Sequence, residues 1–185
     1  KTADLDRKPF FSHLRTVLRH RQLATQGSLN MDGKKWRLGV GALGISASLL
    51  VSIALNEGYR GEAYKDAVGV PTVGYGETKG VTMKSRTTPD RALVQLLSSA
   101  NRHADDIRQC ISVPLYQHEF DAYVSLAYNI GAKNFCHSTL VRKLNAENYK
   151  GACTEIRRWN KAGGKVLPGL TKRREKEYRM CMGEV

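Results

Sequence analysis

An uncharged stretch of nineteen residues, LGVGALGISASLLVSIALN at 38–56, constrains the fold of this 185-residue chain more than any other feature. Nineteen helical residues span about 28 Å, close to the roughly 30 Å hydrocarbon core of a bilayer. Lys34, Lys35 and Arg37 lie directly before it. By the positive-inside rule, the stretch predicts a hydrophobic helix that holds residues 1–37 in the cytoplasm and exports the body.

The same stretch is a weak anchor. Nine of its residues are Leu, Ile or Val, and the other ten are Gly, Ala, Ser or Asn. The nine apolar residues supply only about −4 kcal/mol of insertion free energy, which glycine and serine reduce further. Two alternatives remain open: a cleaved signal peptide, although no clear small-x-small site precedes the body, and a buried helix of a soluble protein.

Charge is concentrated before this stretch. Residues 1–37 hold nine basic and three acidic residues, and the whole chain carries +13. Such a balance indicates a polyanionic partner: nucleic acid, an anionic membrane or an acidic cell-wall polymer. Residues 10–24 are either a basic amphipathic helix or a disordered tail. Because Met31 begins a charged run typical of a natural start, an upstream extension without function is the alternative interpretation of residues 1–30.

The body, residues 57–185, is expected to be one α+β domain. Residues 52–62 continue as helix, and the Gly-, Val- and Tyr-rich residues 64–77 form a β-hairpin. Thr88 and Pro89 begin a helix that runs to about Gln109. Apolar spacing predicts a helix over 116–130, ended by Gly131, and three more over 138–144, 149–159 and 171–182. The pattern predicts a small hairpin lobe followed by a helical lobe.

Two acidic residues lie in the densest cluster of glycine and tyrosine. Cleavage of a glycosidic bond requires two carboxylates, one protonated and one ionised. Glu57 at a helix end and Asp66 on a glycine-rich hairpin provide such a pair. Nearby glycines let the backbone approach a ligand: Gly61, Gly69, Gly74 and Gly76.

At these residues the chain closely resembles the phage-type lysozymes of glycoside hydrolase family 24. Their motif E-G-x-R…Y-x-D-x-x-G…T-x-G-x-G matches here from Glu57 through Asp66 and Thr72 to Gly76. The resemblance continues through AYNIG at 127–131 and closes with PGLTKRREKE at 168–177. It covers about residues 52–182 and implies a lysozyme-like fold.

The resemblance also implies roles for individual residues. Glu57 would be the general acid, Asp66 the base or electrostatic partner of an attacking water, and Thr72 would position that water, with inversion at the anomeric carbon. Arg173, or alternatively Arg174, would approach Glu57 from the last helix.

The expected reaction is hydrolysis of the β-1,4 bond between N-acetylmuramic acid and N-acetylglucosamine by a monomeric endolysin. Gly74, Asn129 and Arg173 are expected at the glycan. For Asn129, a capping role beside Gly131 is the alternative.

The 38–56 stretch resembles the signal-anchor-release segment of some phage endolysins. This similarity implies an inactive enzyme on the host inner membrane, facing the periplasm, which is later released into the periplasm.

The four cysteines, Cys110, Cys136, Cys153 and Cys181, all lie in the body. In an oxidising periplasm they permit two disulfides in any of three pairings, and free buried thiols are the alternative. No metal-binding, phosphate-binding or dinucleotide motif appears, so neither a metal nor a cofactor is expected. A non-enzymatic, membrane-active basic protein is the main alternative function. Nucleic-acid binding is suggested by charge alone and is not expected.

Overall fold

The structure, a computed structural model, describes residues 36–66 and 69–184. Residues 37–185 form one compact unit. Nearly all of the predicted basic head, residues 1–35, lies outside the described residues, and so do the expectations for it.

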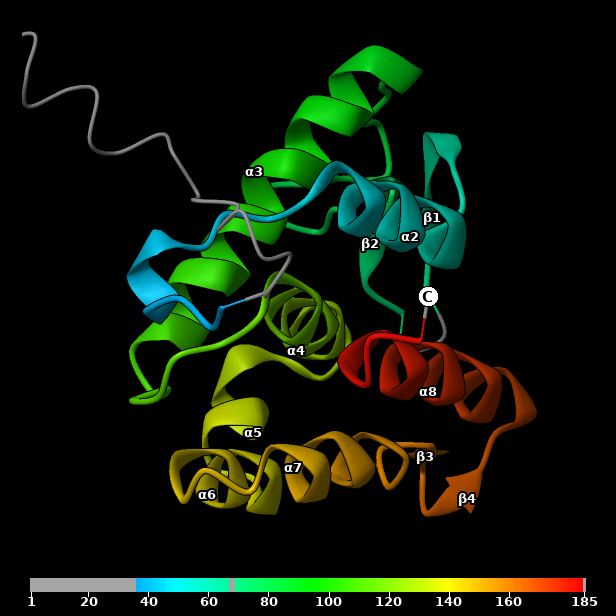
Figure 1. The fold of residues 1–185 in the computed structure, drawn as a ribbon. Coiled ribbons are helices and arrows are strands. Elements are labelled where there is room, and N and C mark those ends of the chain that lie inside the picture. The colour runs from blue at the N-terminus through cyan, green and yellow to red at the C-terminus, as the bar shows by residue number, and fades with distance from the viewer. Residues whose placement is uncertain (1–35, 67–68, 185) are drawn as a thin grey trace, which may run out of the picture. The chain divides into compact units, whose positions relative to one another are not determined.

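The described unit is a mixed fold of helices and two small hairpins (Figure 1). The elements in chain order are η1 (Val40–Ala42), α2 (Ala47–Glu57), β1 (Arg60–Lys65), β2 (Pro71–Gly74), α3 (Pro89–Arg108), α4 (Gln117–Ile130), α5 (Ala132–Cys136), α6 (Thr139–Asn145), α7 (Tyr149–Ile156), β3 (Lys161–Ala162), β4 (Lys165–Val166) and α8 (Pro168–Cys181).

Helix α4 is the centre of the core. Figure 1 shows it between α3 and α8, and every residue from Glu119 to Ala127 is buried. Its N-terminus is closed by a capping box in which the backbone N–H of Tyr116 donates to Glu119 Oε2 at 2.8 Å. Gly131, with φ +84°, ends the helix as expected. The core therefore forms around a helix that water does not reach over most of its length.

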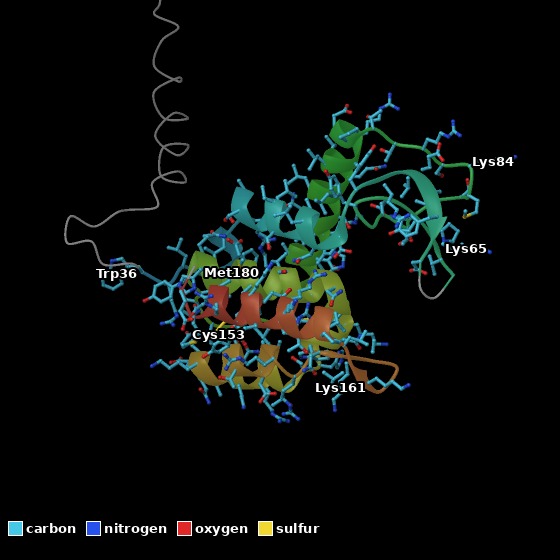
Figure 2. All side chains as sticks on the ribbon, turned by 90° about the vertical axis from the view of Figure 1, so that its right-hand side faces the viewer. Trp36, Lys65, Lys84, Cys153, Lys161 and Met180 are labelled. Atoms are coloured by element: carbon cyan, nitrogen blue, oxygen red, sulfur yellow. A yellow bond between two sulfur atoms is a disulfide. The ribbon has the colours of Figure 1, made fainter. Side chains whose placement is uncertain are left out.

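The hairpin lobe begins earlier than the sequence predicts. Strands β1 and β2 pair antiparallel with Tyr64 opposite Thr72, and the register shifts between Arg60 and Tyr64. Lys65 and Lys84 lie on this lobe, whereas Lys161 lies on the helical lobe (Figure 2).

The long helix of the sequence prediction is present as α3, with Pro89 in its first turn. Thr88 is the N-cap, but its side chain makes no capping hydrogen bond.

The region around the uncharged stretch differs from expectation. Residues 38–56 do not form one hydrophobic helix: η1 is followed by a loop and then by α2, whose N-cap is Ser46. The helix also does not continue to residue 62. It ends at Glu57, because Gly58 adopts φ +70° and the chain turns into β1. Among the described residues, no helix has both the length and the apolar character needed to cross a bilayer.

Two disulfides close the helical lobe. Cys110 pairs with Cys136 across 5.6 Å between Cα atoms, and Cys153 pairs with Cys181 across 5.7 Å. The expectation of two bridges is confirmed, and the structure decides the pairing that the sequence left open.

Candidate active site

Glu57 is the last residue of α2, and the core fixes its position. Ile53 and Leu49, one and two turns before it, are completely buried. The Glu57 side chain itself keeps 23% of its surface exposed. A carboxylate on a well-packed helix end, with partial access to water, is held in place and is open to a ligand.

Arg173 of α8 binds this carboxylate. Its Nη1 donates to Glu57 Oε1 at 2.9 Å, and the arginine side chain is only 10% exposed. Of the two arginines considered from the sequence, Arg173 is therefore the one that meets Glu57. Arg174 is completely buried and points to Glu177 instead.

Glu177 joins the two arginines in a buried charge network. Its Oε1 accepts from Arg173 Nε and from Arg174 Nη2, each at 3.2 Å, and from Ser125 Oγ at 2.7 Å. Burial raises the pKa of Glu177, and the two guanidinium groups oppose that change. The sequence analysis included this residue in the closing motif but gave it no role, although its spacing of four from Arg173 on a helix indicates an ion pair.

Backbone lies close to the other oxygen of Glu57. A β-carbon at Gly76 would lie 3.3 Å from Glu57 Oε2, and Gly76 has φ +86°. The sequence analysis took this glycine as one that admits a ligand, whereas in the structure it also makes room for Glu57.

Tyr128 Oη donates to the carbonyl of Tyr75 at 3.3 Å. Burial, together with the charge of Glu57, raises the pKa of Tyr128 to about 12.

Asp66 and Thr72 lie at the far end of the hairpin. Glu57 precedes β1 and Asp66 directly follows it, so the two carboxylates flank one strand. Asp66 Oδ1 accepts from the backbone N–H of Val70 at 2.8 Å, and the Thr72 hydroxyl donates to the carbonyl of Val70 at 3.0 Å. The structure thus brings Asp66 and Thr72 together around one turn residue.

The other two candidates lie apart from these contacts. Gly74 is opposite Arg60 in the hairpin, and a β-carbon there would lie 3.1 Å from the Ala92 side chain, so packing against α3 already requires glycine. Asn129 is exposed in the last turn of α4. In the described part of the chain, no cluster of three or more His, Cys, Asp or Glu side chains is arranged to hold a metal.

A small hairpin lobe, a helical lobe and an arginine-bound glutamate at a helix end define a glycoside hydrolase of the lysozyme class. Residues 54–177 match the family model described as Phage lysozyme. The chain belongs to the phage lysozyme family, and it is a peptidoglycan-hydrolysing enzyme of host-cell lysis.

Known relatives and solved structures agree with this assignment. The chain is 40% identical over 146 residues to a protein named SAR-endolysin from Bacteriophage PS119, covering 77% of this chain and 87% of that one. It is 39% identical over 149 residues to the SAR-endolysin of Enterobacteria phage P21, covering 78% and 90% of the two chains.

Among solved structures, the endolysin of Escherichia coli O157:H7 phage FAHEc1 superposes with a TM-score of 0.71 at 34% identity, covering 77% of this chain and 96% of that one. A P22 lysozyme mutant gives a TM-score of 0.67 at 34% identity, covering 76% and 99%.

Proposed function

We propose that Glu57 is the general acid of an inverting muramidase. The observation that carries this proposal is the seating of Glu57 at the end of α2, with Arg173 at 2.9 Å and Gly76 against its second oxygen. A general acid must stay within reach of the leaving oxygen, and these contacts restrict the carboxyl group to one place. Its proton would go to the glycosidic oxygen between N-acetylmuramic acid and N-acetylglucosamine.

Asp66 and Thr72 would act on the attacking water. An ionised Asp66 accepts the proton of that water, and Thr72 orients it on the face of the sugar opposite the acid. Inversion requires space for this water between carboxylate and sugar. Glu57 precedes β1 and Asp66 follows it, so the two carboxylates come from opposite ends of one strand.

Three further residues would contact or order the glycan. Arg173 holds the acid, Gly74 lets the hairpin backbone approach the sugar, and the exposed side chain of Asn129 is available for a hydrogen bond. The reaction in this proposal uses water and protein side chains with no cofactor, and the active species is a monomer.

The test of catalysis compares two glutamate variants on purified peptidoglycan. Glu57→Gln keeps the shape of the side chain but cannot donate a proton, so the rate of turbidity loss should fall by roughly 10²–10⁴-fold. Glu62→Gln, in the same lobe and with a largely exposed side chain paired to Arg86, is the control and should retain activity. Near-normal turnover by Glu57→Gln would contradict the assigned role, whereas killing of cells by an inactive variant would favour a membrane-active protein.

We also propose that residues 38–56 first anchor the enzyme in the host inner membrane and then leave it. Residues 1–37 would form the cytoplasmic head, 57–185 the periplasmic lysozyme domain, and the released enzyme would act in the periplasm. The similarity to relatives named SAR-endolysin supports this proposal. The weak insertion free energy of about −4 kcal/mol also supports it, because a marginal anchor can exchange between bilayer and water.

The membrane potential would act on the charged head. Release carries the positive charges next to the anchor outward against an inside-negative potential, at about 2.3 kcal/mol per charge for each 100 mV. Loss of the potential therefore removes a barrier comparable to the anchoring energy itself. In cell fractionation, the protein should move from membrane to periplasm after a depolarising ionophore is added, and a protein that was soluble from the start would contradict the anchor.

A further inference from the structure

Glu177 of α8 is a buried acidic residue that the proposed mechanism does not use. Only 2% of its surface is exposed, and it lies one helical turn after Arg173. Its Oε1 accepts from Arg173 Nε at 3.2 Å, while Arg173 Nη1 donates to Glu57 Oε1 at 2.9 Å. The planar guanidinium group of Arg173 is therefore fixed between two carboxylates, one in the interior and one in the candidate active site.

Ser125 connects these residues to the central helix α4. Its side chain is completely buried, and its hydroxyl donates to Glu177 Oε1 at 2.7 Å. Helices α4 and α8 pack together (Figure 1), and Ser125 lies in the part of α4 in which every residue is buried. The position of Arg173, and through it that of the Glu57 carboxylate, thus follows from the packing of α8 on α4.

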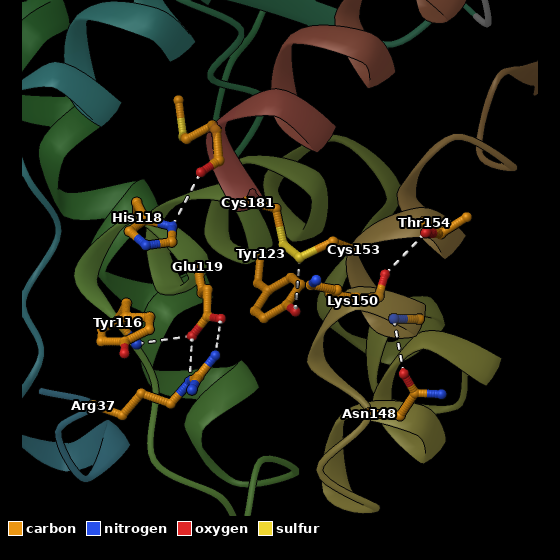
Figure 3. Close-up of a disulfide and its surroundings, with 12 residues drawn as sticks. Arg37, Tyr116, His118, Glu119, Tyr123, Asn148, Lys150, Cys153, Thr154 and Cys181 are labelled. Atoms are coloured by element: carbon orange, nitrogen blue, oxygen red, sulfur yellow. Dashed lines mark hydrogen bonds and ion pairs between the residues drawn. A yellow bond between two sulfur atoms is a disulfide. The ribbon is translucent and has the colours of Figure 1, made fainter. Parts of the chain in front are cut away.

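A second buried carboxylate, Glu119 at the start of α4, shows a simpler arrangement. Its two oxygens accept from the guanidinium group of Arg37 at 2.8 and 3.2 Å (Figure 3). Among the described residues, one guanidinium group faces Glu119, whereas two face Glu177. The Arg37–Glu119 pair is therefore neutral by itself, but the group around Glu177 is neutral only when a further carboxylate is counted with it.

That further carboxylate is Glu57. Arg174 is completely buried, and its Nε lies 2.8 Å from Glu177 Oε2. Both arginines stay protonated at the pH values at which enzymes work. With an ionised Glu177, the pair of arginines presents one net positive charge to Glu57, and without it the pair would present two. Because nearby positive charge favours a carboxylate over a carboxylic acid, Glu177 helps Glu57 to take the protonated form that an acid catalyst needs.

Glu177 itself is held in its ionised form by its donors. Burial raises its pKa, and the guanidinium groups of Arg173 and Arg174 lower it, as does the hydrogen bond from Ser125. Hydrogen bonds and positive charges both stabilise a carboxylate over its protonated form. A neutral Glu177 would also leave the completely buried Arg174 without a counter-charge, which is a costly arrangement in a protein interior.

Further titratable groups near Glu57 come from α3, α4 and the turn after β2. Burial raises the pKa of Tyr128 of α4 to about 12, so this tyrosine stays neutral. The ring of His103 of α3 lies 5.1 Å from that of Tyr128, and Glu77 lies 3.6 Å from Arg102 of α3. A substitution at Glu177 alters none of these groups, so its effect reports on the two arginines and the two glutamates.

We propose that Glu177 is a positioning residue for the general acid of this enzyme. It orients the guanidinium group of Arg173 toward Glu57, and it balances the positive charge of Arg174. The inference rests on the proposed function, because it takes Glu57 as the acid. Glu177 acts through Arg173 from the interior, since a side chain that is almost completely buried is out of reach of a glycan.

The experiment records the initial rate on purified peptidoglycan as a function of pH, with the full chain. In the proposed mechanism, the alkaline limb of this profile follows loss of the proton that the acid donates. In Glu177→Gln this limb should move to lower pH by about one unit, so the rate on the limb should fall about tenfold. Glu175→Gln is the matched control, because it removes the same charge from α8 where Glu175 binds Arg157 at the surface. Its alkaline limb should stay where it is in wild type.

Arg174 gives a test of charge balance that is independent of lost packing. Arg174→Met removes one positive charge, so the alkaline limb should move to higher pH. Arg174→Met combined with Glu177→Gln removes one charge of each sign, and the limb should return to the wild-type pH. All variants are assayed at a temperature at which circular dichroism shows them folded. If Glu177→Gln alone does not fold, the opposite shift in Arg174→Met still decides, because a structural role predicts no shift.

Two outcomes would overturn the role of Glu177 and leave the acid in place, provided that Glu57→Gln is inactive. One is an alkaline limb of Glu177→Gln that stays at the wild-type pH. The other is an equal loss of rate at every pH in Glu177→Gln and in the double variant, because Glu177 would then only support the fold. Near-normal turnover by Glu57→Gln would instead overturn the proposed acid, and the role of Glu177 with it.

Discussion

The two halves of the 38–56 stretch are held by different kinds of contact. Residues 38–46 are bound mainly through their carbonyl and N–H groups, and glycines 39, 41 and 44 are exposed. Residues 47–56 form all but the last residue of α2, which places Leu49 and Ile53 in the core. The exposed glycines of the first half can therefore be replaced, whereas Leu43 of the first half and the buried residues of the second half belong to the core and cannot.

Each half also has a salt bridge at its outer end. Arg37 binds Glu119 before the first half, and Glu57 binds Arg173 after the second. The first bridge involves a residue outside the proposed reaction, and the second involves the proposed acid. One short segment therefore combines a loop bound largely through its backbone, residues 38–46, with helix α2, whose packing positions the proposed acid Glu57.

The largest effect is expected in the second half. Ile53→Ala removes a completely buried side chain and leaves a cavity, so the free energy of unfolding should fall by about 3 kcal/mol. Activity should be lost at lower temperature, since Glu57 lies one turn further along. Val51→Ala, on the exposed face of α2, is the control. Thermal unfolding measures both, and equal losses would refute the division.

A substitution at the boundary between the two halves should lower the free energy of unfolding by less. Ser46 Oγ accepts from the backbone N–H of Leu49 at 3.1 Å as the N-cap of α2. Ser46→Ala should reduce the free energy of unfolding by about 1 kcal/mol. Ser48→Ala, at an exposed position inside the helix, should change it by only a few tenths of a kcal/mol, and a larger loss at Ser48 than at Ser46 would count against the cap.

The carboxylate that binds the first half gives a pH-dependent test. Burial raises the pKa of Asp121, so the ionised form is disfavoured in the fold. Stability from this group is complete below its unfolded pKa of about 3.8 and is lost as pH rises through the folded value.

Asp121→Asn keeps an acceptor for Ser46 and Gln117, and it should be more stable than wild type at pH 7, where the raised pKa makes the charge of Asp121 unfavourable in the fold. The difference should shrink towards pH 4 in matched unfolding curves. An asparagine variant that is less stable at pH 7 would show that the charge itself is needed.

The smallest effect on the folded enzyme is expected at the glycines of the first half. A β-carbon at Gly39, Gly41 or Gly44 meets nothing within 4 Å. Replacing all three by Leu should alter the free energy of unfolding of the soluble enzyme by about 0.5 kcal/mol or less per site. Each leucine adds about 0.3–0.6 kcal/mol of membrane preference, so cells should retain the variant in the membrane fraction and lyse late. Release on the wild-type schedule would refute a releasable anchor.

Local chemistry made much of the fold predictable. Pro89 marks the start of α3 and Gly131 the end of α4, because each residue limits the backbone in its own position. The spacing of Glu57, Asp66 and Thr72 was enough to find the candidate site, since residues at fixed spacings can be recognised in a sequence without knowledge of the fold.

Other features depend on long-range geometry. The apolar pattern gives no sign that helix α2 stops at Glu57, because the stop depends on the φ of Gly58. The partner of each cysteine depends on how α7 packs on α8 and how α5 lies against the end of α3. Arg108 and Gln117 bind backbone carbonyls, a group that every residue has. The identity of the bound residues therefore could not predict these contacts.

The two disulfides lie entirely in the part of the chain that follows the proposed anchor. Both join residues within 110–181, and neither reaches the stretch from 37 to 57. Under the proposed topology, the cross-linked part can mature in the periplasm while the anchor is still inserted. Only a short segment then remains to be ordered, so the delay between membrane collapse and lysis is set by one local, unimolecular step. That delay should be insensitive to oxidants and to enzyme concentration.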